Sequence, residues 1–218
     1  MSRVVDLSHP IRDAMAAYPG LPPVRIHALL EREASRERYD GQAEFLLAGF
    51  ELAGNTGTYL DAPFHRFADG TDLAGLDLER LVDVEGLCVD ATDDGRPMRL
   101  DAFEDGDVRD RAVLFRTGWD VWWGSEEYWR DSPFLPRETV ERLVAAGARL
   151  VAIDAGNVDD TGDPSRPAHT GLLATGIPIL ENLTNLAALP HDGFRVTAAP
   201  LPFEAGATFP VRAYARLG

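Results

Sequence analysis

The stretch from Pro136 to Asp154 constrains the fold of this chain more than any other. Residues 137–146 carry apolar side chains on one helical face, with Pro136 before them and Gly147 directly after them. Proline favours the start of a helix, and glycine favours the position just beyond its last turn. A buried-type strand, Leu150–Ile153, follows at once. A helix that runs directly into a buried strand is typical of α/β proteins.

Short apolar runs bounded by turn residues predict further strands. These runs are Val4–Leu7, Val24–Ala28, Phe45–Ala53, Gly86–Asp90, Ala112–Arg116, Phe194–Ala198 and Val211–Ala215. The charged segment Glu31–Asp40 is expected to form an exposed connection. Because strands outnumber helices and do not alternate with them regularly, we predict a mixed α/β fold in one domain over residues 1–218.

The charge of the chain excludes several classes of function. Asp and Glu number 36 against 21 basic residues, which gives a net charge of −15, and all 21 basic residues are Arg. An acidic chain is a poor ligand for nucleic acid or for an anionic membrane surface, so we expect neither partner. The absence of lysine excludes a Schiff-base lysine and a P-loop lysine.

The single cysteine, Cys88, lies in an apolar run, and we expect it to be a small buried side chain. One thiol can form neither an internal disulfide nor a thiolate metal cluster. The N-terminus lacks the apolar core of a signal peptide, and no stretch approaches the roughly 18 apolar residues that span a bilayer. These features predict a cytoplasmic protein.

Polar residues that could be catalytic gather in two segments. In the first, Pro63 disfavours a continuous helix, so Asp61 and His65 are expected on a loop or tight turn. The alternative is an Asx-turn from Asp61 beside a surface histidine. In the second, His169 follows a turn-like segment and Glu181 ends an apolar run. That carboxylate needs a charged partner or a metal ion, unless it begins a short helix over 181–187.

Together these segments resemble the cyclase family typified by bacterial kynurenine formamidase, of which isatin hydrolase is a relative. The family hallmark, His-x-Gly-Thr-His-x-Asp-x-Pro-x-His, corresponds to residues 55–65, which read Asn-Thr-Gly-Thr-Tyr-Leu-Asp-Ala-Pro-Phe-His. Further similar segments are Asp6–Pro10, Tyr18–Gly20, Arg116–Trp119, Pro200–Pro202 and Gly206–Ala207. The resemblance therefore covers nearly the whole chain.

The resemblance implies a swivelling β/β/α fold, assembly into dimers or tetramers, and metal-dependent hydrolysis of an amide or lactone with one or two Zn²⁺ or Mn²⁺ ions. In the family pattern, Asp61, His169 and Glu181 match the ligands of one ion. His65 matches the residue that acts as acid and base.

The hallmark is changed at two positions, where Asn55 and Tyr59 replace metal-binding histidines. A neutral amide is a poor Zn²⁺ ligand, and tyrosine ligates well only as the phenolate, from a pKa of about 10. We therefore expect one Mn²⁺ or Zn²⁺ ion on the remaining ligands, or none. Tyr59 becomes a candidate catalytic hydrogen-bond donor, and Asn55 a candidate substrate-binding residue. Alternatively, both replacements close an inactive site.

Aromatic residues cluster at Trp119, Trp122, Trp123, Tyr128 and Trp129. They form either a wall for a planar aromatic substrate, with Trp119 as a binding residue, or a core or subunit-interface patch. His9 and His27 are expected to be structural, and His191 to lie in an exposed turn.

The leading hypothesis is a hydrolase of a small cyclic or aryl amide, or of a lactone, that uses one divalent metal and His65 as acid and base. A second hypothesis is a metal-independent cyclase, dehydratase or isomerase of secondary metabolism that uses His65 and Tyr59. A third is a non-catalytic binding protein. Retention of four polar residues favours an enzyme with a small-molecule substrate, because a site without function has no reason to keep buried charges.

Overall fold

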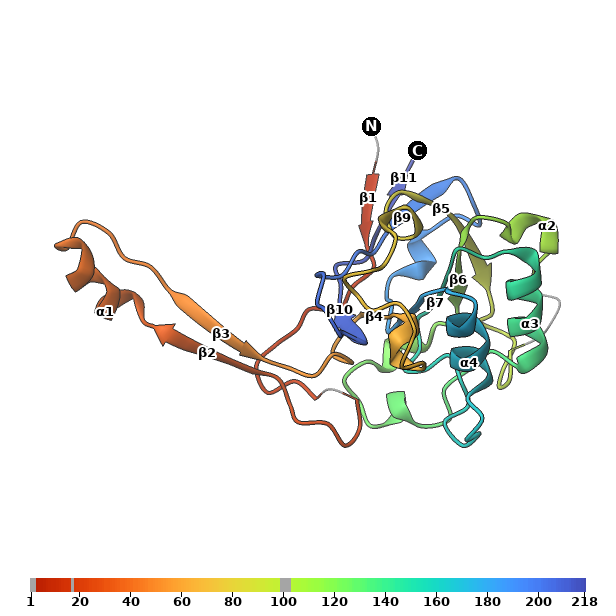
Figure 1. The fold of residues 1–218 in the computed structure, drawn as a ribbon, viewed down its shortest axis with the longest axis horizontal. Coiled ribbons are helices and arrows are strands. Elements are labelled where there is room, and N and C mark those ends of the chain that lie inside the picture. The colour runs from red at the N-terminus through yellow and green to blue at the C-terminus, as the bar shows by residue number, and fades with distance from the viewer. Residues whose placement is uncertain (1–2, 17, 99–102) are drawn as a thin grey trace.

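The computed structural model describes residues 3–16, 18–98 and 103–218, which form a mixed sheet, a layer of helices and a projecting ribbon (Figure 1). The strands are β1 (Arg3–Asp6), β2 (Arg25–Leu30), β3 (Leu47–Glu51), β4 (Tyr59–Asp61), β5 (Val84–Asp90), β6 (Ala112–Arg116), β7 (Leu150–Ile153), β8 (Ile179–Glu181), β9 (Phe194–Thr197), β10 (Thr208–Pro210) and β11 (Tyr214–Leu217). The α-helices are α1 (Arg32–Arg36), α2 (Asp105–Val108), α3 (Arg137–Ala146) and α4 (Pro167–Ala174). Short 3-10 helices are η1 (Glu37–Tyr39), η2 (Pro63–His65), η3 (Leu78–Arg80), η4 (Trp119–Trp122), η5 (Glu127–Trp129) and η6 (Leu186–Ala188). The predicted mixed α/β class is confirmed.

The main sheet has the strand order β1-β11-β9-β5-β6-β7-β8-β4-β10 among the described residues. Strands β5 to β8 run parallel, and the strands outside them pair antiparallel. Parallel strands require both faces to be covered, which explains why β7 is apolar along its whole length and β6 is apolar up to Phe115. The helix-to-strand step from α3 to β7 supplies one of the parallel connections.

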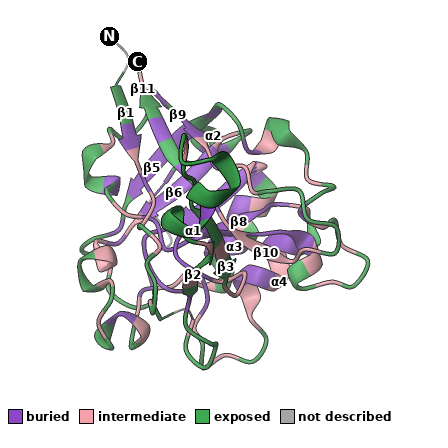
Figure 2. Ribbon diagram, turned by 90° about the vertical axis from the view of Figure 1, so that its left-hand side faces the viewer, coloured by how far each residue is buried: buried purple, intermediate pink, exposed green. Residues whose placement is uncertain are grey.

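Side chains of the parallel strands alternate between two apolar cores. Along β6, Val113 and Phe115 pack with residues of α3 and α4, whereas Ala112 and Leu114 pack on the opposite face. Cys88 is buried in the second core, as predicted. The central strands β5, β6 and β8 colour as largely buried in Figure 2, and the site described below lies on the sheet side that α4 covers.

Helix α3 confirms the prediction from its sequence, with the same bounds. Val140 and Leu143 are buried against the sheet, and Gly147 ends the helix with φ of 81°. The amide of Gly147 donates to the carbonyls of Leu143 and Val144. A residue in this left-handed conformation is usually glycine because it has no Cβ to clash.

The C-terminal strands differ from the prediction, which placed one strand over Val211–Ala215. The structure has β10 and β11 on either side of residues 211–213. The amide of Val211 donates to the carbonyl of Thr58 (2.9 Å), and the amide of Leu7 donates to the carbonyl of Ala213 (3.0 Å). These contacts bend the chain from one edge of the sheet toward the other, so a single strand cannot form.

Residues 25–51 form an arm that projects from the body (Figure 1). Strands β2 and β3 pair antiparallel along it, and α1 with η1 lies at its far end. The predicted exposed connection Glu31–Asp40 is exposed, but it contains these two short helices. Ser35 is the one side chain of the arm that is buried. None of the helices in the described ranges is long and apolar enough to cross a membrane.

Candidate active site

Strands β4 and β8 place three of the predicted site residues on one face. Tyr59 and Asp61 are two residues apart on β4, and Glu181 of β8 pairs directly with Tyr59. Side chains two apart on a strand, or opposite one another on neighbouring strands, project to the same side of the sheet. His169, on the buried face of α4, meets them from the helical layer.

One local expectation is wrong, and one of two open alternatives is excluded. Asp61 was expected on a loop, but it is the last residue of β4, because β4 pairs with β10 on one side and β8 on the other. Glu181 does not begin a helix. It ends β8, and Asn182 then turns the backbone with φ of 58°, which terminates the strand. His65 lies in the single turn of η2, as the position of Pro63 suggests.

Asp61, His169 and Glu181 are buried and offer ligand atoms that lie within 4.8 Å of one another. His169 Nε2 is 3.7 Å from Asp61 Oδ2 and 3.9 Å from Glu181 Oε1. Both carboxylate oxygens of Asp61 are buried without a hydrogen-bond partner. A buried carboxylate without donors is costly, so the group that fits this arrangement is a cation. One imidazole and two carboxylates are a donor set that suits Mn²⁺ or Zn²⁺.

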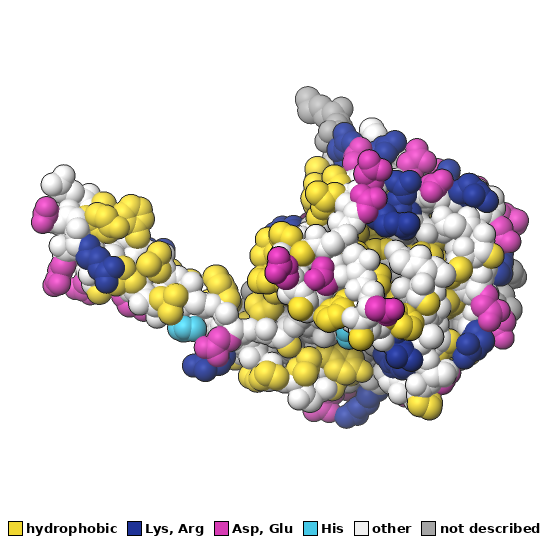
Figure 3. Space-filling model, viewed as in Figure 1, with side chains coloured by type: hydrophobic (Ala, Val, Ile, Leu, Met, Phe, Trp, Pro, Cys, Tyr) yellow, Lys and Arg dark blue, Asp and Glu magenta, His cyan; other side chains and the backbone are white. Residues whose placement is uncertain are grey.

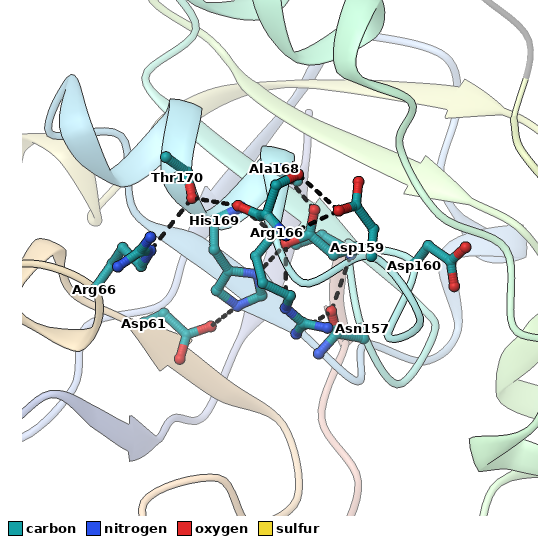
Figure 4. A network of polar contacts seen from close by, with 12 residues as sticks. Asp61, Arg66, Asn157, Asp159, Asp160, Arg166, Ala168, His169 and Thr170 are labelled. Atoms are coloured by element: carbon teal, nitrogen blue, oxygen red, sulfur yellow. Dashed lines mark hydrogen bonds and ion pairs between the residues drawn. The ribbon is translucent and has the colours of Figure 1, made fainter.

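Asp159 orients the imidazole of His169. His169 Nδ1 is 2.7 Å from Asp159 Oδ2, which also accepts from the amide of His169, and Asp159 Oδ1 accepts from the amide of Ala168 (Figure 4). A proton on Nδ1 leaves Nε2 directed at Asp61 and Glu181, as in histidines that bind metals. Burial lowers the pKa of His169, but the contacts with Asp159 and Asp61 and the charge of Glu181 raise it to about 10.

Glu181 is held by a backbone amide and by a tyrosine. Its Oε1 accepts from the amide of Val158 (2.8 Å), and its Oε2 accepts from the hydroxyl of Tyr59. Burial raises the pKa of Glu181 to about 7. Burial and the charges of Glu181 and Asp61 also raise the pKa of Tyr59 well above its ordinary value. Tyr59 is therefore a neutral hydrogen-bond donor here and not a phenolate ligand.

His65 and Asn55 lie at the margin of this cluster. The His65 side chain is 34% exposed, and its Nε2 is 3.9 Å from Asp61 Oδ1. Burial lowers the pKa of His65, so its imidazole is neutral at physiological pH. Asn55 is half-buried, and its Oδ1 accepts from the hydroxyl of Thr208 (3.2 Å). Its amide also contacts the hydroxyl of Tyr59.

The aromatic cluster is divided between the core and a small cavity. The indole N–H of Trp119 donates to the carbonyl of Tyr128 (2.9 Å), and its ring packs against the apolar core. Trp123 stacks on His9 with 4.1 Å between ring centroids. Trp129 lines a cavity of about 200 Å³. The other residues that line it are Tyr18, Pro19, Ser132, Gly156, Asn157 and Thr161. His27 packs over Gly49 in the arm, and His191 is exposed.

Three residues around the site, Asp159, Val158 and Arg166, were not predicted from the sequence. All three follow β7 or precede α4, in the segment that the parallel strand β7 delivers to the site. Ligands of open α/β sheets bind beyond the carboxyl ends of parallel strands. The acidic residues that follow the predicted strand Leu150–Ile153 are therefore the sequence feature that points to this segment as part of the site. Arg166 lies 3.7 Å from Asp159 and donates to the side chain of Asn157 (2.9 Å).

The fold is similar to that of solved structures described as hydrolases. An isatin hydrolase bound to the product analogue thioisatinate superposes with a TM-score of 0.82 at 25% identity, covering 99% of this chain and 92% of that one. Isatin hydrolase A from Ralstonia solanacearum has a TM-score of 0.85 at 24% identity, covering 100% of this chain and 92% of that one. The chain therefore has the fold of these proteins.

The sequence comparisons give the family. Residues 5–160 match the family model described as putative cyclase. Kynurenine formamidase of Salinibacter ruber is 33% identical, covering 98% of this chain and 97% of the relative. Kynurenine formamidase of Bacillus cytotoxicus is 28% identical, and the match covers 99% of this chain and 98% of that relative. The chain belongs to the cyclase family, as its sequence motifs predict.

Proposed function

We propose that this protein hydrolyses a small cyclic or aryl amide, or a lactone, with one Mn²⁺ or Zn²⁺ ion and with His65 as acid and base. The names of its relatives, a formamidase and a hydrolase of isatin, support the hydrolysis of an aryl or cyclic amide. Another protein with the same fold is described as a potential metal-dependent hydrolase with cyclase activity, which supports the use of a metal ion.

The observation that carries the proposal is the environment of Asp61. Its two carboxylate oxygens are buried and unpartnered, and the Nε2 atom of His169 faces them. Asp61, His169 and Glu181 would hold the cation. When bound, such an ion supplies Lewis-acid polarisation of a carbonyl and lowers the pKa of a water molecule toward about 7.

His65 is the group that moves protons in this proposal. Its imidazole is neutral because burial lowers its pKa, and it is exposed enough to meet a substrate. It can accept a proton from the attacking water and return it to the leaving nitrogen or oxygen. The carboxylate of Asp61, 3.9 Å away, favours the protonated form between these two steps.

Tyr59 and Asn55 receive different roles from those of the histidines that they replace. The hydroxyl proton of Tyr59 is donated to Glu181, so we assign Tyr59 to holding that carboxylate in place. Asn55, half-buried beside it, is assigned to substrate contact through its amide. Trp119 would offer a substrate only its ring face, because its N–H is bound to Tyr128.

At the level of the whole chain, we propose one functional domain over residues 1–218, in a bacterial cytoplasmic enzyme that forms a homodimer or homotetramer. The coverage of 97% and 98% of the two kynurenine formamidases supports a single functional unit. The uncovered arm supports self-association.

Metal content tests the proposal directly. Elemental mass spectrometry of protein purified without chelator or a metal-binding tag should find about one Mn or Zn per chain. His169→Ala should lose the ion, and His191→Ala, an exposed control, should keep it. His65→Ala should keep the ion but lose at least about 100-fold in the rate of amide hydrolysis, the usual contribution of a general acid–base.

Absence of metal after incubation with both ions, or undiminished hydrolysis by stripped protein, would contradict the proposal. Acid–base chemistry by a metal-independent cyclase, dehydratase or isomerase would then be the better account. In that case Tyr59→Phe and His65→Ala should both abolish turnover.

A further inference from the structure

The cavity of about 200 Å³ lies beside the candidate metal ligands. The backbone that lines it at Asn157 continues into Val158, whose amide donates to Glu181 (2.8 Å). Tyr18 lines the cavity from another segment, and its amide donates to the carbonyl of Asn55 (3.4 Å). The cavity therefore borders both the segment that holds the carboxylate of Glu181 and the segment that carries Asn55.

Two aromatic rings form part of the cavity wall. Tyr18 and Trp129 both line it, and their ring centroids are 5.4 Å apart at an interplanar angle of 73°. Trp129 lies against Gly156, where a Cβ atom would come within 3.0 Å of the indole ring. A cavity of about 150 Å³ holds a benzene molecule, so this one has room for a single aromatic ring with a small substituent.

The side chain of Asn157 brings a hydrogen-bond donor to this cavity. Asn157 is 5% exposed, and its Oδ1 accepts from the amide of Asp159 (2.9 Å) and from Nη2 of Arg166 (2.9 Å; Figure 4). Because both contacts need an acceptor, they identify that atom as the oxygen and leave Nδ2 as a donor. Within the described ranges, Nδ2 has no hydrogen-bond partner. A buried donor without a partner is costly, so a ligand that offers an acceptor satisfies it.

We propose that Asn157 is a specificity-determining residue, whose Nδ2 donates to an oxygen acceptor on an aromatic ring bound in this cavity. The inference rests on the proposed hydrolysis of an aryl amide, and it adds the requirement that the ring carries a polar substituent. Arg166 is a positioning residue in this account, because its contact with Oδ1 keeps the amide of Asn157 from turning over.

The surroundings of the cavity favour a neutral acceptor, such as a carbonyl oxygen, over an anionic one. None of the described residues that line the cavity is charged. The guanidinium of Arg166 is directed to Asp159 (3.7 Å) and Asn157, so the group left for the ligand is a neutral amide. The net charge of −15 repels anions, and Figure 3 shows acidic side chains spread over the face of the body.

Binding of a matched pair of small ligands to the full chain tests the inference. Acetophenone and ethylbenzene have the same size and shape, but only acetophenone carries a carbonyl oxygen. Isothermal titration calorimetry should give an affinity for acetophenone about tenfold higher, because ethylbenzene leaves Nδ2 without a partner. Neither ligand contains an amide, so a failure of the proposed hydrolysis leaves this measurement unaffected.

Variants separate the amide donor from the ring site. Asn157→Asp keeps the shape of the side chain but removes the donor, and it should abolish the preference for acetophenone. Arg166→Met should reduce the preference by a smaller factor, because the amide of Asp159 still holds Oδ1. Gln42→Glu makes the same amide-to-carboxylate change at an exposed position of the arm and should keep the preference. Trp129→Leu should weaken the binding of both ligands about 2- to 10-fold.

Several outcomes would overturn the inference. They are a chain that binds neither ligand, equal affinities for the two ligands, an unchanged preference in Asn157→Asp or Arg166→Met, and unchanged affinities in Trp129→Leu. The preference should also persist after treatment with a chelator. A preference that disappears with the cation would assign the carbonyl oxygen to the cation and not to Asn157. Circular dichroism checks that each variant is folded.

Discussion

At the scale of single residues, the surroundings shift the pKa of histidine side chains in opposite directions. Carboxylate contacts raise the pKa of His169 to about 10 against the effect of burial. Burial lowers the pKa of His65, and it lowers that of His9 to about 4. In the absence of a bound cation, the imidazole of His169 is therefore charged at neutral pH, whereas those of His9 and His65 are neutral.

His9 gives a pH-dependent stability that can be measured. Its ring stacks on Trp123, and its Nε2 is buried without a partner. Burial lowers its pKa from 6.5 to about 4, so the unfolded chain binds the proton more tightly. This contribution to stability is present above pH 6.5 and is lost as the pH falls toward 4. With allowance for screening by solvent, the loss is about 1–2 kcal/mol.

His9→Phe keeps an aromatic ring on Trp123 but cannot take up a proton. Urea unfolding at pH 7 and pH 4 should show a smaller decrease in unfolding free energy for this variant than for the unaltered chain. Equal decreases would mean that His9 does not titrate differently in the folded and unfolded states.

At the scale of elements, very short segments determine the site. β4 and β8 have three residues each, yet their pairing aligns Tyr59, Asp61 and Glu181 on one face. Helix α4 follows Arg166, whose φ of 48° turns the chain so that His169 reaches the same place. The longer α3 contributes packing to the core, and its C-terminal end has the usual left-handed glycine, Gly147.

The end of α3 provides a matched pair of glycine substitutions. Gly147 has φ of 81°, where alanine is strained, so Gly147→Ala should lower the unfolding free energy by about 1 kcal/mol. Gly106 lies in α2 with open space around its Cβ position and no positive φ. Gly106→Ala should therefore raise stability by about 0.5–1 kcal/mol. Thermal unfolding of both variants checks the opposite signs, and destabilisation by Gly106→Ala would contradict this account.

At the scale of the whole molecule, the candidate site joins parts of the chain that are far apart in sequence. Residues 59–61, 158–169 and 181 belong to two strands, a loop and a helix. A cation held by Asp61, His169 and Glu181 would connect these segments only in the folded state. Its binding free energy would then add to the stability of the fold.

Metal binding should consequently raise the melting temperature. At about 100 times its dissociation constant, a ligand adds about 2.7 kcal/mol, which corresponds to about 5–10 °C for a chain of this size. Calorimetry with and without Mn²⁺ or Zn²⁺ should show this increase for the unaltered chain and for Asp192→Asn, an exposed control. Asp61→Asn should show none, and an unchanged increase in that variant would remove Asp61 from the ligand set.

The sequence by itself determined the local features that depend on neighbouring residues. Pro136, the apolar face of α3 and Gly147 defined a helix with correct bounds, and the motif around Asp61 and His65 defined the family. These signals act over a few residues, so they can be read without knowing the fold.

Tertiary structure alone decided the features that depend on distant partners. Asp61 became a strand residue because β8 and β10 pair with it on both sides, and Glu181 ended a strand because β4 lies opposite. Asp159 became the partner of His169, and the hydroxyl of Tyr59 was directed to Glu181. Each outcome depends on contacts between residues far apart in the chain, and local sequence preference carries no information about which distant segment supplies the partner.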